Sequence, residues 1–406
     1  MRKVIVIGGG ASGLFAAVAA AKSNKKVYLL EKNEKLGKKI YITGKGRCNL
    51  TNNSDLQDFL KNVVRNPKFL YNALNALSVE DTMDFFSDNG LPLKTERGNR
   101  VFPVSDKASD VTKTLEKICK KYGVEILLNT KVTDIEVKNG IVSGVRTKNG
   151  LFECDSIIVC TGGLSYPLTG SDGDGYGFAK KTGHNIIPLK PALCGIETEE
   201  NFCGQLQGLS LKNVSLSAKY NGKTVFSEFG EMLFTHYGIS GPIVLSCSSN
   251  VNRNYSDNLT IILDLKPALS EDKLENRFIR DLSAGNLKSV ATVLVSALPK
   301  SLIPVVLEIA KINPRKKCAE ITAVERKRLV FVLKNFEMKV KKLRPLEEAI
   351  VTSGGIDVKQ INPKTMESKI IKGLFFAGEV IDVDAYTGGF NLQTAFSTGY
   401  LAGLNS

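Results

Sequence analysis

The stretch VIVIGGGASG at residues 4–13 decides how this chain folds. Its opening β-branched run, residues 4–7, is typical of a strand buried on both faces of a parallel sheet. The glycines that follow fill the fixed places of a G-x-G-x-x-G motif, at Gly8, Gly10 and Gly13. In that motif the first glycine makes a tight turn, the second lets a pyrophosphate approach the backbone, and the third lets a helix pack closely on the strand. We therefore expect a dinucleotide-binding turn here.

The segments after the glycines complete this motif. An alanine-rich segment ending near residue 21 predicts a helix whose first N–H groups face the phosphates. Residues 27–30 predict a second strand, and Glu31 follows it, 23 residues after Gly8. A carboxylate at that place accepts hydrogen bonds from ribose hydroxyls and repels a 2′-phosphate. The alternative, a glycine-rich turn without a ligand, is disfavoured because strand, helix, second strand and acid occur in the expected order. The predicted nucleotide contacts are Gly8, Gly10, Ala11, Ser12, Gly13, Glu31 and Lys32.

Composition places the chain among soluble globular proteins. Of its 406 residues 43% are hydrophobic and 24% charged, which excludes a disordered, collagen-like or coiled-coil polypeptide. Glycines interrupt the apolar N-terminal stretch, and no other run reaches the roughly 18 apolar residues that a membrane span needs. Eight scattered cysteines without a C-x-x-C pair indicate reduced thiols and a cytoplasmic protein. Two histidines are too few for a histidine-rich centre, so we expect no metal.

Local patterns beyond the first thirty residues predict three further regions. Residues 55 to about 125 are predicted to be helical, with breaks at Pro67 and at 90–92. Asn221-Gly222 between two alternating runs predicts an antiparallel hairpin. Ser270 is the expected N-cap of the first of three or four short helices at 271–335.

Five segments along the chain resemble one family. The segment 36–52, with the runs LGKK and TGKGRCNLTN, closely resembles a motif of the BaiN/YhiN-type flavoproteins, a branch of the two-dinucleotide-binding-domain FAD fold. The others, in chain order, are RVFP at 100–103, TGGLSYP at 161–167, FTHYGISGP at 234–242 and the glycine-rich run at 373–393. The motifs fall in order between residues 4 and 403, so the resemblance covers essentially the whole chain. Two departures are Lys45 and Ala385, which stand where the family usually or often has glycine.

The resemblance implies the fold class and the domain organisation. We expect an α/β protein with a Rossmann-like FAD-binding domain formed by both chain ends, and an inserted domain that is part β-barrel-like and part helical. The FAD would be held noncovalently. The expected bounds are 1–190 and 346–406 for the FAD-binding domain, and 191–345 for the inserted domain, β-rich at 191–268 and 336–345 and helical at 269–335.

The same segments imply contacts with the cofactor. Arg47 would pair with the pyrophosphate, and Asn49 would bond the isoalloxazine edge or fix its loop. Cys48 is expected to be a packed or flavin-contacting thiol rather than a redox thiol, because no partner cysteine is near in sequence. The helix after Gly389 would point its N–H groups at the flavin N1–C2=O edge, unless this is an ordinary glycine-capped join. The remaining implied contacts are Val132, through its backbone, and Thr161, Gly162, Gly378, Glu379, Phe390, Asn391, Leu392 and Gln393.

His236, beside Tyr237 in the expected inserted domain, is the candidate catalytic proton donor or substrate anchor. A histidine of ordinary pKa, about 6.5, exchanges protons near neutral pH. An equally weighted alternative is a structural histidine bonded to backbone in a glycine-rich bend. Arg100 and Tyr166 are weaker candidates for substrate binding in the same pocket, and His184 is expected to cap or pack.

The resemblance implies hydride or electron transfer through flavin N5. We expect reduction of an activated C=C bond of a small steroid- or enone-like substrate, with His236 or Tyr237 supplying the proton. NAD(P)H is the expected electron donor, and it would dock transiently because no second G-x-G-x-x-G follows a strand. Two alternatives stay open: an amine or aminoketone oxidase that uses O₂, and an RNA-binding or tRNA-modifying flavoprotein.

The net charge of +14 is the observation behind the last alternative. Residues 311–344 hold twelve lysines and arginines against three acids, a composition that suits an anionic partner. Aromatic residues are sparse there, since only Phe331 and Phe336 occur and Phe336 fits the core face of a strand. Basic helical faces are mostly solvated, so we expect a small-molecule substrate and neither nucleic acid nor membrane as partner.

Overall fold

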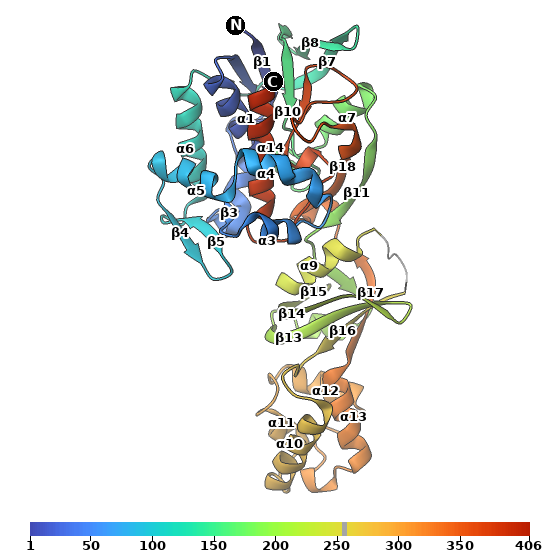
Figure 1. The fold of residues 1–406 in the computed structure, drawn as a ribbon. Helices are drawn as coiled ribbons and strands as arrows, with labels where there is room; N and C mark the ends of the chain where they lie inside the picture. The colour runs from blue at the N-terminus through green and yellow to red at the C-terminus, as the bar shows by residue number, and fades with distance from the viewer. Residues whose placement is uncertain (254–257) are drawn as a thin grey trace. The chain divides into compact units, whose positions relative to one another are not determined.

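The computed structural model describes residues 1–253 and 258–406, which form two compact units (Figure 1). Unit 1 combines both chain ends, Met1–Ala192 and Leu346–Ser406, and unit 2 is the intervening segment Leu193–Pro345. Unit 1 is built on a parallel sheet flanked by helices, whereas unit 2 contains a closed β-barrel and a group of helices. The predicted fold class is therefore confirmed.

The core of unit 1 is a five-stranded parallel sheet in the order β19-β10-β1-β2-β6. β1 is paired with β2 on one side and with β10 on the other, so that Ile5 lies opposite Tyr28 and Ile157. β19 pairs in turn with β10, and β6 with β2. Because all five strands run in one direction, their carboxyl ends meet at one edge, where open α/β sheets bind ligands. The strands are β1 (Lys3–Ile7), β2 (Lys26–Leu30), β6 (Glu125–Leu127), β10 (Ser156–Val159) and β19 (Leu374–Phe376).

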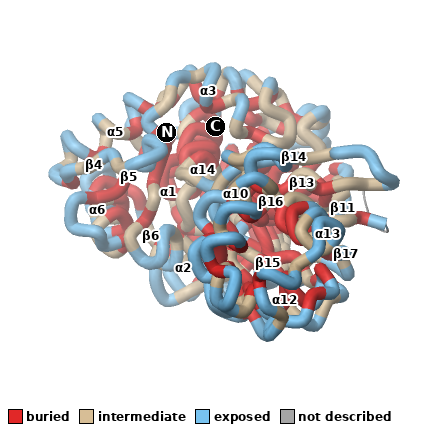
Figure 2. Tube along the Cα trace, turned by 90° about the horizontal axis from the view of Figure 1, so that it is seen from below, coloured by how far each residue is buried: buried red, intermediate tan, exposed pale blue. Residues whose placement is uncertain are grey.

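Two helices of unit 1 pack backbone to backbone. α1 (Ala11–Lys22) and α14 (Phe390–Asn405) are buried along most of their length (Figure 2). A Cβ atom added at Gly399 would lie 2.1 Å from the carbonyl oxygen of Ser12, and one added at Gly403 would lie 2.3 Å from that of Ala16. Gly399 lies against Ser12, and Gly403, four residues later, lies against Ala16, also four residues later. The two helices therefore run parallel.

Shorter elements surround this centre. The helices are α2 (Lys38–Ile42), α3 (Leu56–Lys61), α4 (Tyr71–Ala76), α5 (Val79–Asp88), α6 (Ala108–Lys121) and α7 (Asp174–Lys181). The first small sheet is antiparallel and joins β3 (Thr51–Asn52), β5 (Arg100–Pro103) and β4 (Leu93–Glu96). A second antiparallel sheet joins β7 (Val132–Lys138), β8 (Ile141–Thr147) and β9 (Gly150–Glu153). A third pairs β11 (Ile186–Ala192) with β18 (Val351–Ile356).

The helical prediction for residues 55–125 is wrong at 93–103, where β4 and β5 form an antiparallel hairpin. Gly98 and Asn99 in its turn have φ angles of 75° and 57°, a left-handed backbone that glycine and asparagine adopt readily. β5 also pairs with β3, a partner about fifty residues away in the chain. This long-range pairing overrides the local pattern.

The barrel of unit 2 has six antiparallel strands in the order β12-β15-β14-β13-β16-β17. The predicted hairpin is present at Asn221-Gly222, where both residues have positive φ, of 48° and 79°. Leu216, Phe234 and Phe336 point into the core and are 0% exposed. α8 (Phe202–Gln205) and α9 (Pro242–Val251) pack on the barrel. The strands are β12 (Ile196–Thr198), β13 (Ser210–Tyr220), β14 (Lys223–Thr235), β15 (Gly238–Ser240), β16 (Leu259–Asp264) and β17 (Phe336–Leu343).

Between β16 and β17 the chain forms four helices, as the sequence predicts. The side-chain oxygens of Ser270, Ser289 and Thr322 cap three of them by accepting backbone N–H groups. Among residues 1–253 and 258–406, no helix is long and apolar enough to cross a membrane. The four helices are α10 (Glu271–Ala284), α11 (Val290–Leu294), α12 (Leu302–Ile309) and α13 (Ala323–Lys334).

Replacing Gly399 by alanine tests the contact between α1 and α14. The new methyl group would overlap the Ser12 carbonyl oxygen, so we expect the free energy of unfolding to fall by about 1–3 kcal/mol. Gly177→Ala is the matched control, because no atom lies within 4 Å of a Cβ at that helical position. Alanine there should be neutral or stabilise by up to about 1 kcal/mol. Thermal melting of both variants is the measurement, and equal melting temperatures would contradict the packing.

Candidate functional site

The carboxyl ends of four neighbouring strands lead into predicted cofactor contacts. β1 is followed by Gly8, β2 by Glu31, β10 by Cys160 and Thr161, and β19 by Ala377 and Gly378. These positions come from the beginning, middle and end of the chain. The parallel sheet therefore brings them to one edge.

The glycine turn after β1 has the shape of an anion site. Gly8 has a φ angle of 103°, and a Cβ atom there would lie 2.5 Å from the carbonyl oxygen of Cys160. A Cβ atom at Gly13 would lie 1.8 Å from the carbonyl oxygen of Gly8, whereas nothing lies within 4 Å of one at Gly10. α1 starts directly after Gly10 with neither a side-chain cap nor an acid in its first turn. The positive end of the helix is thus available to a phosphate.

Glu31 lies beside this turn and is only 7% exposed. Its carboxylate accepts a hydrogen bond from the Gly9 N–H at 2.7 Å. It also accepts from the backbone and side-chain nitrogens of Asn33, at 2.8 and 2.7 Å. Since an ionised carboxylate has about four acceptor positions, one remains for a hydroxyl group of a ligand.

Two buried oxygens in predicted contacts have no hydrogen-bond partner within the described part of the chain: Asn49 Oδ1 and Thr161 Oγ1. A buried polar atom without a partner costs about 1–3 kcal/mol, so it calls for an explanation such as a ligand. Glycine leaves the space beside Thr161, because a Cβ atom at Gly175 would lie 2.1 Å from its Oγ1. Gly162 has a φ angle of 72° and packs on Ser171, whose Oγ would lie 2.7 Å from an added Cβ atom.

The loop before Asn49 has a left-handed backbone at four positions. Gly44, Lys45, Gly46 and Cys48 have φ angles of 56°, 58°, 85° and 61°. Such a conformation costs a residue other than glycine about 1–2 kcal/mol, which is a physical reason for the glycine that the resembled family has in place of Lys45. Burial raises the pKa of Cys48 to about 12, so this thiol stays protonated at neutral pH and is a poor nucleophile.

Arg47 is engaged by two carboxylates. Its guanidinium pairs with Glu96 and, at 2.7 Å, with Asp106, and it lies 4.1 Å from the centroid of the Phe102 ring. These contacts neutralise its charge. The arrangement therefore gives no support to the predicted pairing of Arg47 with pyrophosphate.

Lys32 follows β2, and Val132 is the first residue of β7. Lys32 is held by Asp172 at 2.5 Å and by Asp174 at 3.0 Å. Val132 is 4% exposed and pairs with Thr147 in the β7–β8 ladder. Their contacts with a nucleotide stay predictions.

The end of β19 is tied to the rest of this edge. A Cβ atom at Gly378 would lie 2.5 Å from Ser12 Oγ, so the strand end touches the start of α1. Glu379 forms an ion pair with Lys39 at 2.6 Å and accepts a hydrogen bond from Ser165 at 2.9 Å. Lys39 is missing from the predicted contacts, although it stands in the LGKK run of the family motif.

α14 presents a second free helix N-terminus. Its N-cap, Gly389, has a φ angle of 104°, and a Cβ atom there would lie 2.3 Å from the carbonyl oxygen of Thr51. No acid occupies its first turn. α14 begins nine residues before Gly399, which contacts Ser12 near the start of α1. Ser12 is the second residue of α1, so at 1.5 Å per residue the N-terminus of α14 extends about 12 Å beyond that of α1, in the same direction.

The side chains of Asn391 and Gln393 hold this helix start in place. Asn391 bonds both the backbone nitrogen and the backbone oxygen of Ala385, at 3.0 and 2.7 Å. Gln393 accepts from Thr51 Oγ1 at 2.6 Å and donates to Thr82 Oγ1 at 2.7 Å. The backbone N–H groups of the first turn, at Phe390 to Leu392, are what remains for a ligand.

In unit 2, His236 and Tyr237 form the turn between β14 and β15. Their ring centroids are 5.0 Å apart, and the Arg344 guanidinium lies 4.5 Å from the centroid of the Tyr237 ring. Gly195 makes room for the phenol, because a Cβ atom there would lie 2.5 Å from its oxygen. The two candidate side chains are adjacent, and their catalytic role stays a prediction.

The remaining candidates lie in unit 1. Arg100 begins β5 and Tyr166 lies in the segment after β10, and their substrate roles also stay predictions. His184 is buried, with its ring nitrogens 3.0 Å from Thr182 Oγ1 and 2.7 Å from Ser368 Oγ, and burial lowers its pKa. It is a packed, structural histidine. Among the residues that the structure describes, no group of three or more His, Cys, Asp or Glu could hold a metal.

The sequence model of the HI0933-like Rossmann-domain family matches residues 2–405. This chain belongs to that family. The family is the predicted BaiN/YhiN-type flavoprotein family, so the resemblance in the sequence is confirmed. As a member of the HI0933-like family, the chain is an FAD-dependent oxidoreductase.

This HI0933-like chain is similar in sequence to named proteins and in fold to solved structures. It is 32% identical to the 3-dehydro-bile acid delta(4,6)-reductase of Clostridium scindens, over 99% of this chain and 98% of that protein. It is also 32% identical to the ribosomal RNA dihydrouridine synthase of Haemophilus influenzae, over 99% and 97%. The 3-ketosteroid-delta4-(5alpha)-dehydrogenase of Rhodococcus jostii has a TM-score of 0.54 at 15% identity, covering 100% of this chain and 96% of that one. At that identity the likeness shows the fold alone.

The residues at the sheet edge fit the FAD that the HI0933-like family uses. The open glycine turn and the start of α1 suit its pyrophosphate. The spare acceptor position of Glu31 suits a ribose hydroxyl. Asn49 Oδ1 and Thr161 Oγ1 have no partner in the described chain, so a ligand at this edge would find two free acceptors there.

Thr161→Val separates a ligand contact from a structural one. Because its hydroxyl has no partner in the described chain, its loss should leave the stability of the apoprotein unchanged or raise it. FAD affinity should fall about 3- to 10-fold, the worth of one neutral hydrogen bond. The measurements are FAD titration and melting of the apoprotein.

Thr182→Val is the matched control for this variant. Its hydroxyl donates to the carbonyl oxygens of Phe178 and Ala179, both at 3.0 Å, so its loss should destabilise the apoprotein and spare FAD affinity. A Thr161→Val protein with reduced stability and normal FAD affinity would contradict the assignment.

Proposed function

We propose that this enzyme reduces a carbon–carbon double bond conjugated to a carbonyl group. The observation that carries the proposal is that two full-length relatives of equal identity have names that denote this one kind of reaction. In a 3-oxo steroid, a delta-4 double bond is conjugated to the C3 carbonyl. In uridine, the C5=C6 bond that becomes saturated in dihydrouridine is conjugated to the C4 carbonyl. The two substrates differ in size and charge, but the reacting groups are alike.

Bound FAD supplies the two-electron donor for such a reduction. The chain's own residues hold and orient the FAD: the start of α1 binds the pyrophosphate, and Glu31 binds the ribose. The N–H groups that begin α14 stabilise negative charge on the group bound there. NAD(P)H, as a transiently bound reductant, remains part of the proposal.

A set of electron donors and acceptors tests this reaction class. We expect NADH or NADPH to bleach the flavin anaerobically, and a 3-oxo-delta-4 steroid or a uridine-containing RNA to restore its colour with loss of the double bond. Stopped-flow absorbance follows both half-reactions separately. Bleaching by an aminoketone, with peroxide released in air, would instead establish the oxidase alternative.

Ribosomal RNA is the second candidate substrate. The relative of equal identity named as a ribosomal RNA enzyme and the net charge of +14 both favour it. The sequence-based expectation that nucleic acid is not a partner is therefore unconfirmed. A polyanionic substrate gains affinity from positive charge on the protein, whereas a bile acid presents a single anionic group.

His236→Gln tests the proposed proton donor. Flavin content and reduction by NAD(P)H should stay nearly intact, while reoxidation by the organic substrate should slow by roughly 10²- to 10⁴-fold, the usual worth of a general acid. His184→Gln is the control, since His184 is buried and doubly hydrogen-bonded and its loss should lower stability without slowing reoxidation. Unslowed reoxidation in the His236 variant would remove His236 from the mechanism.

A further inference from the structure

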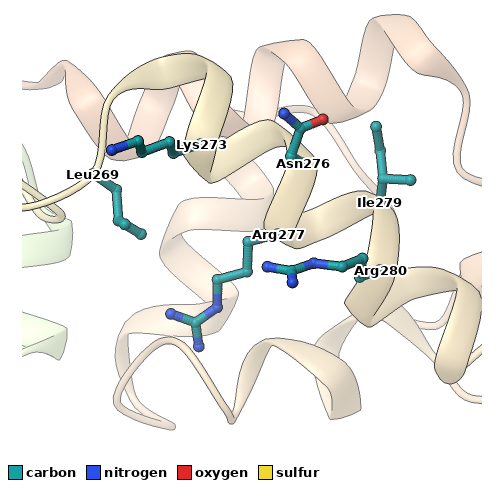
Figure 3. A pocket seen from close by; sticks show the side chains of 6 residues that line it. All are labelled: Leu269, Lys273, Asn276, Arg277, Ile279 and Arg280. Atoms are coloured by element: carbon teal, nitrogen blue, oxygen red, sulfur yellow. The ribbon is translucent and has the colours of Figure 1, made fainter.

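A hollow on the surface of α10, in unit 2, is open to solvent and carries no surplus charge. It measures about 640 Å³ and is lined by Leu269, Lys273, Asn276, Arg277, Ile279 and Arg280 (Figure 3). The three cations of α10 are matched by four acids on the same helix. None of the lining side chains has a buried polar atom without a partner. The lining of this hollow therefore does not point to a ligand.

The first turns of α14, in unit 1, contain a buried hydroxyl group outside the predicted contacts. Thr394 is 5% exposed, and its Oγ1 atom has no hydrogen-bond partner within the described part of the chain. A threonine in a helix can bond a carbonyl oxygen of the preceding turn, as Thr112 of α6 does with Ser109 at 2.9 Å. The Thr394 hydroxyl forms no such bond. Burying an unpaired hydroxyl is unfavourable, so this one calls for a ligand.

Thr394 lies on the face of α14 that is turned toward the end of β19. Thr398, one helical turn later, accepts the backbone N–H of Gly378 at 3.0 Å and donates to the Thr394 carbonyl oxygen at 2.6 Å. A Cβ atom added at Gly378 would lie 3.9 Å from the Cβ atom of Ala395. Residues four apart share one face of a helix, so Thr394 is directed toward the same edge of the sheet as Thr398.

Along the helix axis, Thr394 lies between the two free helix N-termini. Gly399 packs on Ser12 near the start of α1, and Thr394 lies five residues, or about 7.5 Å, beyond that level. α14 begins four residues further on, about 6 Å beyond Thr394. In FAD the ribityl chain joins the pyrophosphate to the isoalloxazine ring. With the pyrophosphate at the start of α1 and the ring at the start of α14, we expect the ribityl chain to run past Thr394.

The neighbouring predicted contact, Glu379, is largely engaged by the protein. Its Oε1 atom accepts from the Ser165 hydroxyl at 2.9 Å and from the Thr352 N–H at 2.8 Å. Its Oε2 atom accepts from the Lys39 ammonium at 2.6 Å. An ionised carboxylate has about four acceptor positions and donates nothing, so Glu379 offers a ligand one acceptor. The Thr394 hydroxyl can donate as well as accept, which is the complement that a ribityl hydroxyl needs.

We propose that the Thr394 hydroxyl forms a hydrogen bond with a hydroxyl group of the ribityl chain of FAD. Thr394 is then a cofactor contact that follows the glycine-rich run at 373–393 and is not part of it. The anionic pyrophosphate and the flavin edge have the N–H groups of the two helix starts as donors, whereas the ribityl hydroxyls are neutral and suit a neutral partner. The inference concerns the cofactor and is independent of the substrate that the enzyme reduces.

Binding of FAD to the apoprotein, compared with binding of three FAD analogues that each lack the 2′-, 3′- or 4′-hydroxyl of the ribityl chain, tests the contact. Thr394→Val should bind FAD about 3- to 10-fold more weakly than the wild type, the worth of one neutral hydrogen bond. For one of the three analogues the variant and the wild type should bind equally well, because the bond is already absent. The melting temperature of the Thr394→Val apoprotein should stay unchanged or rise, since no bond of the described chain is lost. Thr394→Ser, which keeps the hydroxyl, should restore FAD affinity.

Thr112→Val is the matched control, because Thr112 is also a buried helical threonine and its hydroxyl is paired within the protein. This variant should lower the melting temperature of the apoprotein. Its affinity for FAD and for each analogue should equal that of the wild type. Thr394→Ala repeats the comparison if the valine variant does not fold, with the same expected loss of affinity for FAD and the same insensitive analogue.

Two results would overturn the proposal. One is FAD affinity in Thr394→Val equal to that of the wild type, which would make the hydroxyl a structural or water-bonded group. The other is an equal loss of affinity for FAD and all three analogues, which would place the bond on another part of the cofactor. A protein that shows the expected dependence on one ribityl hydroxyl yet reduces no conjugated double bond supports this contact and overturns the proposed reaction.

Discussion

The parallel pairing of β1 with β2 and β10 is the constraint on which the rest of unit 1 depends. Val4, Ile5 and Val6 are 0% exposed, so the strand and the glycine turn at its end have one place in the core. β10 and β19 come from the middle and the end of the chain, and their alignment with β1 carries Thr161 and Gly378 to the same edge. The packing of α14 on α1 has no room for a Cβ atom at Gly399, so the second helix N-terminus is placed as strictly as the first. A cofactor that touches all these segments is therefore bound by the tertiary fold rather than by one motif.

How far the sequence could predict this structure depends on the range of the contacts. The strand, glycine turn, helix and acid within residues 3–31 involve near neighbours, and the G-x-G-x-x-G spacing expresses them directly. The hairpin at Asn221-Gly222 is equally local, since two residues with positive φ define it. The segment 93–103 was predicted as helix because its pairing with β3 lies outside any local window. The turn residues Gly98 and Asn99 are the signal that could have revealed this hairpin.

At the candidate site, too, the sequence predicts local features and misses long-range contacts. Glycines that admit a close backbone approach can be recognised from spacing, whereas the partners of Arg47 and Gln393 cannot. Glu96 neutralises Arg47 from a strand that was itself mispredicted, and the bonds of Gln393 reach Thr51 and Thr82.

We expect both chain ends together to bind a dinucleotide flavin, and the other expectations for unit 1 follow from this one. It is tested most directly by identifying the flavin that the purified protein releases on heat denaturation, by chromatography against FAD and FMN standards. The free N–H groups at the start of α1 and the spare acceptor position of Glu31 suit an adenosine diphosphate half, which FAD carries and FMN lacks. We expect FAD in an amount equal to that of the protein chain. Release of FMN, or an inability of the apoprotein to bind FAD in preference to FMN, would contradict the account.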